Sequence, residues 1–222
     1  MKGVSLQLCE GEIVSLLGVN GAGKTTLSNI IAGLHPPTSG DVKYLGRSIY
    51  EDPVSYRKMI GLCPQKPDLD QALTLEENLM YAGRYRRLPP EEIRMRVSAL
   101  IEEFSLQEFA KSKASVLSGG YKQRFLIART LVHQPKIILL DEPTVGLDPQ
   151  IRRQLWEQIV LLKEKGSAVL ITTHYLDEAE SLSDWVCIID KGSIQTIDTP
   201  KNLLAAHGLS RLEDVFLILT AK

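Results

Sequence analysis

The glycine-rich segment at positions 18–25 constrains the fold more than any other feature of the chain. It reads Gly-Val-Asn-Gly-Ala-Gly-Lys-Thr and lies between an apolar run at 13–17 and a helical pattern at 25–34. Glycines let backbone N–H groups turn inward around phosphate oxygens without Cβ clashes, and the following helix presents its positive end to the anion. This order of strand, glycine turn and helix predicts a phosphate-binding loop in an α/β fold.

The predicted loop is expected to bind the phosphates of a nucleotide. Lys24 is expected to reach the β- and γ-phosphates, and the hydroxyl of Thr25 is expected to bind Mg²⁺. The alternative is a strand-to-helix turn that is merely rich in glycine. The residues assigned to the phosphate cradle are Gly18, Asn20, Gly21, Ala22, Gly23, Lys24, Thr25 and Thr26.

Short apolar runs separated by helical patterns predict a parallel β-sheet. Such runs fit strands that are covered on both faces, and alternation with helices gives an α/β fold. A helix predicted at 150–165 follows Asp148 and Pro149, which are typical of an N-cap and a first helical position. The predicted strands lie at 13–17, 60–63, 137–140, 168–171 and 186–189.

A length of 222 residues suits a single domain over 1–222 that carries an inserted subdomain. Residues 70–117 are charged and helical, and we expect them to form an α-helical subdomain. The segments 1–69 and 118–222 are expected to form the nucleotide-binding core. The predicted fold is therefore a P-loop NTPase parallel-sheet core, with this insertion and a small antiparallel β part at 41–49.

The composition argues against nucleic acid as a partner and against a chain that spans a membrane. Lys plus Arg is 26 and Asp plus Glu is 27, so the formal net charge is -1, and no nucleic-acid binding is expected. Cys9, Cys63 and Cys187 form no C-x-x-C pair and are expected to be reduced core thiols. No apolar run is long enough to cross a bilayer. We expect a soluble, intracellular chain whose membrane role comes through a partner.

Two adjacent carboxylates follow the buried run at 137–140. In open α/β sheets, ligands bind at the carboxyl ends of the strands. Asp141 is therefore expected to hold Mg²⁺, and Glu142 to orient or deprotonate an attacking water. A solvated Asp-Glu-Pro turn is the alternative, which the phosphate loop disfavours.

A second helix start, at Ser118-Gly119-Gly120, offers another group of exposed backbone N–H groups. Ser118 is a natural N-cap, and a helix N-terminus can bind an anion. No lysine occupies the place that Lys24 has in the first loop. On physical grounds alone, a simple capped helix remains the stronger interpretation.

The segment Leu-Ser-Gly-Gly-Tyr-Lys-Gln-Arg at 117–124 resembles the signature motif of ATP-binding-cassette ATPases. The other marks of that family occur in the same order: Gln65 matches the Q-loop glutamine, residues 146–148 match the D-loop, and His174 matches the switch histidine. The resemblance covers essentially the whole chain. It implies a homodimer that packs head to tail, with each ATP between the phosphate loop of one copy and Ser118 and Gly120 of the other.

The resemblance also implies a role for each matching residue. Glu142, His174 and Lys24 would be catalytic, with His174 holding the γ-phosphate. Gln65 would contact Mg²⁺ or the water and sense the nucleotide for an integral-membrane permease. The ATP site would further include Gln65, Ser118, Gly119, Gly120 and Asp148, and the Mg²⁺ site Thr25, Gln65 and Asp141. Such a subunit would lie at the cytoplasmic face of the membrane, attached through the permease.

The chain departs from the family pattern at two places. Tyr121 stands where the signature commonly has glutamine, which we do not expect to be disabling. The family normally has more chain upstream, including an aromatic residue that stacks on adenine. The 17 residues before Gly18 contain no Phe, Tyr or Trp. The chain is expected to be shortened at its start, with weakened nucleotide affinity and poor base selectivity.

Residues 141–149 and the ending at 212–220 are similar to exporters of drugs, lipids or polysaccharides, so an exporter subunit is the favoured function. The alternative is a non-transport member of the family, associated with DNA repair or translation. No long coiled-coil insertion or second cassette supports it. A permease-binding groove is expected at Met80, Tyr81, Tyr85 and Leu88, unless these side chains form the core of the insertion.

Overall fold

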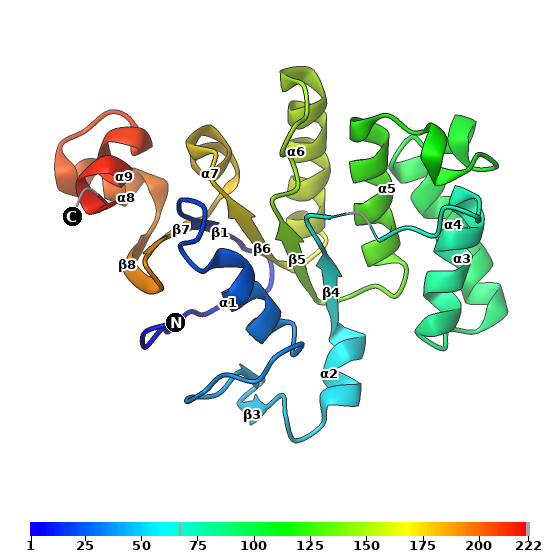
Figure 1. Cartoon of the computed structure of the whole chain (residues 1–222), viewed down its shortest axis with the longest axis horizontal. Helices are drawn as coiled ribbons and strands as arrows, with labels where there is room; N and C mark the ends of the chain where they lie inside the picture. The colour runs from blue at the N-terminus through cyan, green and yellow to red at the C-terminus, as the bar shows by residue number, and fades with distance from the viewer. Residues whose placement is uncertain (67, 221–222) are drawn as a thin grey trace.

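The computed structural model describes residues 1–66 and 68–220. At its centre is a sheet of six strands in the order β4-β5-β6-β1-β7-β8 (Figure 1). All neighbouring strands are parallel except β7 and β8, which are antiparallel. The strands are β1 (Ile13–Leu17), β4 (Ile60–Cys63), β5 (Ile137–Asp141), β6 (Ala168–Thr173), β7 (Trp185–Asp190) and β8 (Ser193–Asp198). The α/β fold with a parallel core is confirmed, and all five predicted strands are present.

Helices cover both faces of this sheet. The helices of the core are α1 (Lys24–Ile31), α2 (Pro53–Met59), α5 (Gly119–Leu131), α6 (Pro149–Glu164) and α7 (Leu176–Leu182). Successive residues of a strand point to opposite faces, and β5 shows this: Ile138 packs with α5 and α6, whereas Leu139 packs with α1 and α2. Helices α1 and α5 therefore begin on opposite faces of the sheet.

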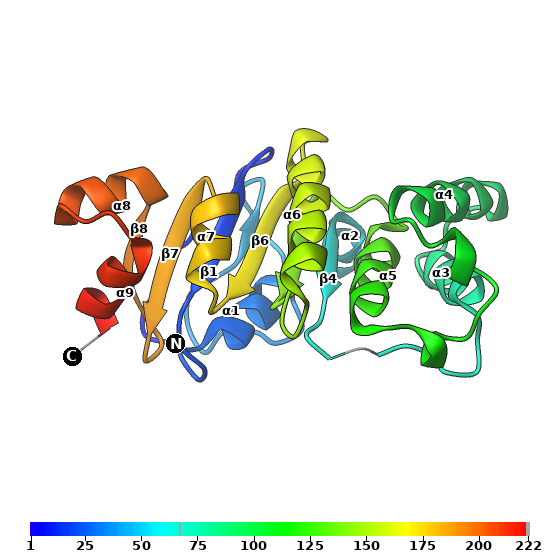
Figure 2. The same cartoon turned by 90° about the horizontal axis from the view of Figure 1, so that it is seen from above.

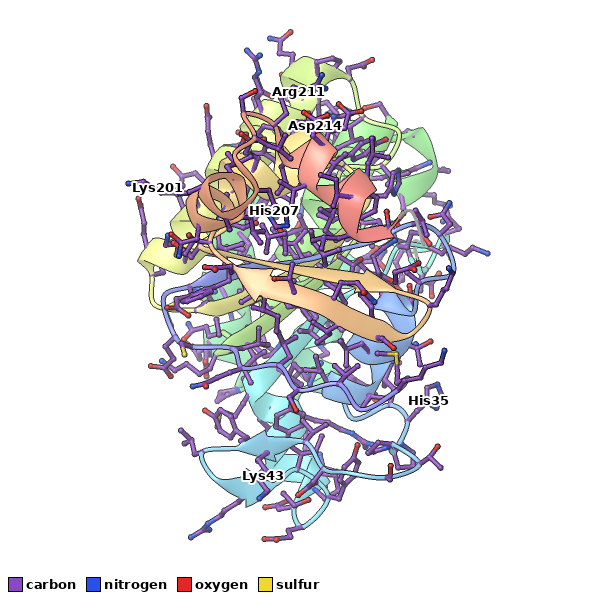
Figure 3. All side chains as sticks on the ribbon, turned by 90° about the vertical axis from the view of Figure 1, so that its left-hand side faces the viewer. His35, Lys43, Lys201, His207, Arg211 and Asp214 are labelled. Atoms are coloured by element: carbon purple, nitrogen blue, oxygen red, sulfur yellow. The ribbon has the colours of Figure 1, made fainter. Side chains whose placement is uncertain are left out.

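The two ends of the molecule are helical. Beyond α5 lie α3 (Leu75–Tyr85) and α4 (Pro90–Glu103), followed by short 3₁₀ turns η1 (Gln107–Phe109) and η2 (Ala114–Val116). The opposite end holds α8 (Pro200–His207) and α9 (Leu212–Thr220) (Figure 2). Figure 3 looks onto this end, where α8 carries Lys201 and His207 and the first turn of α9 carries Asp214. The helices α3 and α4 share one continuous apolar cluster with α5 and the sheet.

The small antiparallel part is a hairpin of β2 (Lys43–Tyr44) and β3 (Arg47–Ser48). Leu45 and Gly46 form its turn with positive φ angles of 49° and 81°. A two-residue turn with positive φ at both positions matches the right-handed twist of the flanking strands. The small antiparallel β part predicted at 41–49 is confirmed.

The structure confirms the core placement of two of the three cysteines and corrects that of the third. Cys63 and Cys187 are buried, and burial raises the pKa of each to about 12, so they are inert core thiols as expected. Cys9 is free but only partly buried, because it lies in the irregular segment before β1, and its expected core placement is wrong.

No helix within residues 1–66 and 68–220 has the length and apolar character needed to cross a membrane.

Candidate functional site: a nucleotide-binding edge of the sheet

Four sequence motifs meet at one edge of the sheet because four neighbouring strands are parallel. The strands β4, β5, β6 and β1 are adjacent and run in the same direction, so their carboxyl ends lie together. Gln65, Glu142, His174 and the loop after Leu17 each follow one of these ends. The sheet topology thus assembles residues that are far apart in the sequence, as ligand sites in open α/β sheets require.

The phosphate loop has the backbone that its glycines predict. Gly21 and Gly23 have positive φ angles of 83° and 111°, a region that glycine enters without steric cost. A Cβ on Gly18 would lie 2.5 Å from the backbone oxygen of Ile189, so no larger residue fits at that position. Gly23 is the N-cap of α1, and Lys24 and Thr25 form its first turn.

Lys24 is held at the bottom of this loop. It is 4% exposed, and its Nζ donates hydrogen bonds to the carbonyl oxygens of Gly18 at 2.7 Å and Val19 at 3.3 Å. Its Nζ also lies 3.4 Å from a carboxylate oxygen of Glu142. The loop thus points a buried ammonium group toward the same space as the carboxylate at the end of β5.

Glu142 is the meeting point of three motifs. Gln65 donates a hydrogen bond from Nε2 to Glu142 Oε2 at 2.8 Å, and Nδ1 of His174 lies 3.4 Å from Glu142 Oε1. Lys24 also contacts Glu142. Each of the four side chains follows a different strand: Lys24, Gln65, Glu142 and His174. The sequence predicts all four residues, and the structure brings them together.

Asp141 faces a different set of groups. Thr25 donates a hydrogen bond from Oγ1 to Asp141 Oδ2 at 3.2 Å, and the hydroxyl of Thr172 donates to the other oxygen. Hard oxygen ligands of this kind suit Mg²⁺. Thr172 was not among the predicted site residues. It lies near the carboxyl end of β6, two positions before His174, and this position could have identified it.

Ser118, Gly119, Gly120 and Asp148 lie elsewhere, lining a separate cavity of about 730 Å³. Ser118 is the N-cap of α5 and Asp148 the N-cap of α6, but neither side chain makes the capping hydrogen bond. Both residues are exposed. A chain that used them only as caps would form those bonds, so the simple capped-helix interpretation accounts for less here than the sequence alone indicates.

Comparisons with known proteins point to the same family as the sequence motifs. The family model "ABC transporter" matches residues 1–145. Nod factor export ATP-binding protein I of Rhizobium sp. (strain N33) is 35% identical over 216 residues, which is 97% of this chain and 71% of that protein. ATP-binding cassette sub-family A member 2 of Homo sapiens is 40% identical over 205 residues, 92% of this chain, although the chain spans only 8% of that longer protein.

A solved structure agrees in fold. The dimeric, post-hydrolysis structure of the ATP-binding cassette MJ0796 bound to ADP and Pi is 31% identical, with a TM-score of 0.81 and coverage of 90% of each chain. The family match, the relatives and this structure agree with the motifs that the sheet edge assembles. The chain therefore belongs to the ABC transporter family and is one of its ATP-binding, ATP-hydrolysing units.

Proposed function

We propose that the chain is the ATPase subunit of a membrane exporter, in which two copies pack head to tail around ATP. The observation that carries this proposal is the convergence of Lys24, Gln65 and His174 on the carboxylate of Glu142. Export is supported by a relative that is named for Nod factor export. The dimer is supported by a related cassette whose structure is dimeric with ADP and Pi.

Hydrolysis transfers the γ-phosphoryl group to water, and it proceeds by positioning and charge neutralisation. Lys24 and the backbone N–H groups of the glycine loop would offset the charge of the phosphates. Glu142 would orient the attacking water and accept its proton. His174, beside Glu142, would hold the γ-phosphate in line with that water.

Mg²⁺ fits the oxygen donors that the structure places together. Thr25 Oγ1 and the Asp141 carboxylate are in hydrogen-bonding contact, and Gln65 is hydrogen-bonded to the adjacent Glu142. Mg²⁺ is commonly bound through one or two carboxylates plus substrate phosphates. The ion would supply positive charge to the β- and γ-phosphate oxygens. Thr25 and Asp141 would hold it directly, and Gln65 would contact it or the water.

The second half of each ATP site would come from the other copy. Ser118, Gly119 and Gly120 present an exposed helix start whose serine makes no capping bond, so hydroxyl and backbone N–H groups remain available to a phosphate. Asp148 lines the same cavity and would contact the partner copy. The γ-phosphate would complete this interface, so ATP would favour the closed dimer over the separate copies.

The permease would dock beside the proposed helical subdomain at 70–117. A groove of about 500 Å³ lies there, lined by Tyr81, Tyr85, Arg86 and His133 among others. Tyr81 is 64% and Tyr85 78% exposed, whereas Met80 and Leu88 pack against the core. Of the four predicted contact residues, only Tyr81 and Tyr85 are therefore exposed enough to contact a permease. Docking there would place the chain at the cytoplasmic face of the membrane.

Glu142→Gln tests the proposed function. The amide keeps the size of the side chain but cannot accept a proton, so the hydrolysis rate should fall by about a hundredfold or more. ATP binding should persist, and gel filtration with Mg-ATP should show a species of twice the mass. Lys24→Ala is the contrasting variant, which should lose about tenfold or more in ATP affinity and form no dimer.

Normal hydrolysis by the Glu142→Gln variant would contradict the role of Glu142. Normal hydrolysis by the unmodified chain, without any dimer at saturating Mg-ATP, would contradict the head-to-tail site.

A further inference from the structure

Glu178 is a buried acidic residue that the predicted machinery does not use. It lies on α7, four positions after His174, and it is 0% exposed. A carboxyl group in such a place costs free energy unless hydrogen bonds offset its loss of hydration. Burial raises its pKa above the ordinary value, against hydrogen bonds that lower it. The buried carboxyl group of Glu178 is therefore unfavourable for stability, which suggests that it serves another role.

The hydrogen bonds of Glu178 join two other segments to α7. Thr144 donates from Oγ1 to Glu178 Oε1 at 2.8 Å, and Trp156 donates from Nε1 to the same oxygen at 3.0 Å. Thr144 belongs to the loop between β5 and α6, two residues after Glu142 and four before Asp148, and it is 0% exposed. Trp156 belongs to the middle of α6. One carboxyl oxygen therefore holds the loop of Glu142 and the body of α6.

The start of α7 is fixed to its surroundings as well. The backbone N–H of Tyr175 donates to Thr173 Oγ1 at 2.9 Å, and the Thr173 hydroxyl also favours the charged form of Glu178. The guanidinium of Arg152 on α6 lies 4.3 Å from the centroid of the Tyr175 ring. These contacts lie on either side of His174, so a displacement of Glu178 would be transmitted to the histidine.

We propose that Glu178 is a positioning residue for ATP hydrolysis, because its bond to Thr144 ties the loop that carries Glu142 and Asp148 to the segment that carries His174. The inference rests on the proposed function. The 3.4 Å approach of His174 to Glu142 joins the same two segments at the reacting centre. A misplacement of about 1 Å at such a centre can cost a hundredfold in rate. Glu178 touches neither nucleotide nor water in this scheme and acts through the two loops.

Two single substitutions separate positioning from simple stability. Thr144→Val and Trp156→Phe each remove one hydrogen-bond donor from the same oxygen, Glu178 Oε1. Valine has nearly the size of threonine, and phenylalanine keeps an aromatic ring on α6, although a smaller one. We expect the thermal midpoint of Trp156→Phe to lie no higher than that of Thr144→Val, because its smaller ring also leaves unfilled space against the core. Thr144→Val should lower kcat about tenfold with the KM for Mg-ATP within about twofold of the unmodified chain. Trp156→Phe should leave kcat within about twofold, and Thr144→Ser, which keeps the hydroxyl, should recover most of the rate.

Amide hydrogen exchange supplies a readout that does not depend on hydrolysis. Thr144→Val should raise exchange in residues 142–148, and Trp156→Phe should not. Equal losses of kcat in the two variants, a rate for Thr144→Val like that of the unmodified chain, or unchanged exchange at 142–148 would each overturn the inference. Absence of hydrolysis by the unmodified chain would instead contradict the proposed function, while the exchange comparison would still decide the role of Glu178.

Discussion

Glu142 owes its position to an uncommon backbone conformation. Its φ is 49°, in the left-handed region that residues other than glycine rarely enter and that costs on the order of 1 kcal/mol or more. Its N–H donates to the backbone oxygen and to the hydroxyl of Thr172, each at 3.0 Å, which stabilises this turn. The turn sends the Glu142 side chain toward Lys24 and Gln65 while Asp141 faces Thr25. Adjacent carboxylates thereby reach different partners.

His133 makes a testable contribution to stability. Its Nε2 lies 3.0 Å from the Ile60 carbonyl oxygen, and burial, followed by the nearby charge of Arg86, lowers its pKa from 6.5 to about 4. Between these two values the unfolded chain binds more protons than the folded one, so stability is lost as the pH falls from 6.5 toward 4. The free energy of unfolding should drop by about 2 kcal/mol from this residue between pH 7 and pH 5.

Urea denaturation at the two pH values checks this prediction, with His133→Gln as the matched control. Glutamine keeps a side-chain N–H donor near Ile60 but does not titrate, so the variant should lose less stability on acidification than the unmodified chain. The same pH dependence in both proteins would show that His133 is not the group responsible.

At the residue scale, the sequence predicts the members of the site better than their individual contacts. Lys24, Asp141, Glu142 and His174 are identifiable because each follows a buried apolar run, and parallel strands bring those ends together. Thr144 and Glu178 could not be identified in the same way. Glu178 is a charged residue in a short polar helix, where exposure is the ordinary expectation. Its burial follows from the packing of α7 against β1, β6 and α9 and from its contacts with Thr144 and Trp156.

At the scale of elements, α3 presents its side chains to two different environments. A capping box begins the helix, in which Thr74 accepts from the Glu77 N–H and Glu77 accepts from the Thr74 N–H. Leu75 and Leu79 are fully buried, whereas Tyr81 and Tyr85 project into the groove described above. Exposed tyrosines of this kind suit a partner surface, because they bury large area at low entropic cost.

Replacing both tyrosines of α3 by alanine tests the groove. In cells that contain the complete transporter, Tyr81→Ala with Tyr85→Ala should reduce recovery of the chain in the membrane fraction by about tenfold or more. ATP hydrolysis by the isolated chain should stay within about twofold, since neither residue contacts the phosphate loop or Glu142. Met95→Ala on α4 is the matched control, because Met95 is 68% exposed and does not line the groove. Equal membrane recovery for the tyrosine variant and the control would rule out this docking surface.

The strands that carry long apolar runs could be predicted, whereas the edge strand β8 and the short helix α2 could not. The strands β1, β5 and β6 are buried along nearly their whole length, which makes them continuous apolar runs. The edge strand β8 has only two apolar residues, Ile194 and Ile197, and no fully buried residue. Helix α2 has seven residues and buries only Tyr56. Neither gives a periodic signal that is long enough to assign its type.

At the scale of the whole molecule, the two proposed half-sites belong to helices on opposite faces of the sheet. Helix α1 and the phosphate loop belong to one face, and α5 with Ser118 belongs to the other. Each half-site has exposed polar groups, as a head-to-tail pair of identical chains requires. The residues themselves predict the fold and the phosphate-loop half-site, whereas the half-site at Ser118 follows from the family resemblance. The pairing itself follows only from resemblance, since apolar patterning encodes nothing about an interface that ATP completes.

A cross-link between chains tests the head-to-tail site most directly. Asn20→Cys in the phosphate loop and Ser118→Cys at the start of α5 are made in separate chains, each with Cys9→Ser, and both native positions are exposed. The two chains are mixed and treated with a short bis-maleimide. We predict a cross-linked species of twice the chain mass that forms with Mg-ATP in the mixture and is much weaker with ADP. If the mixture hydrolyses ATP while no such cross-link forms, the two half-sites do not meet and the central claim is wrong.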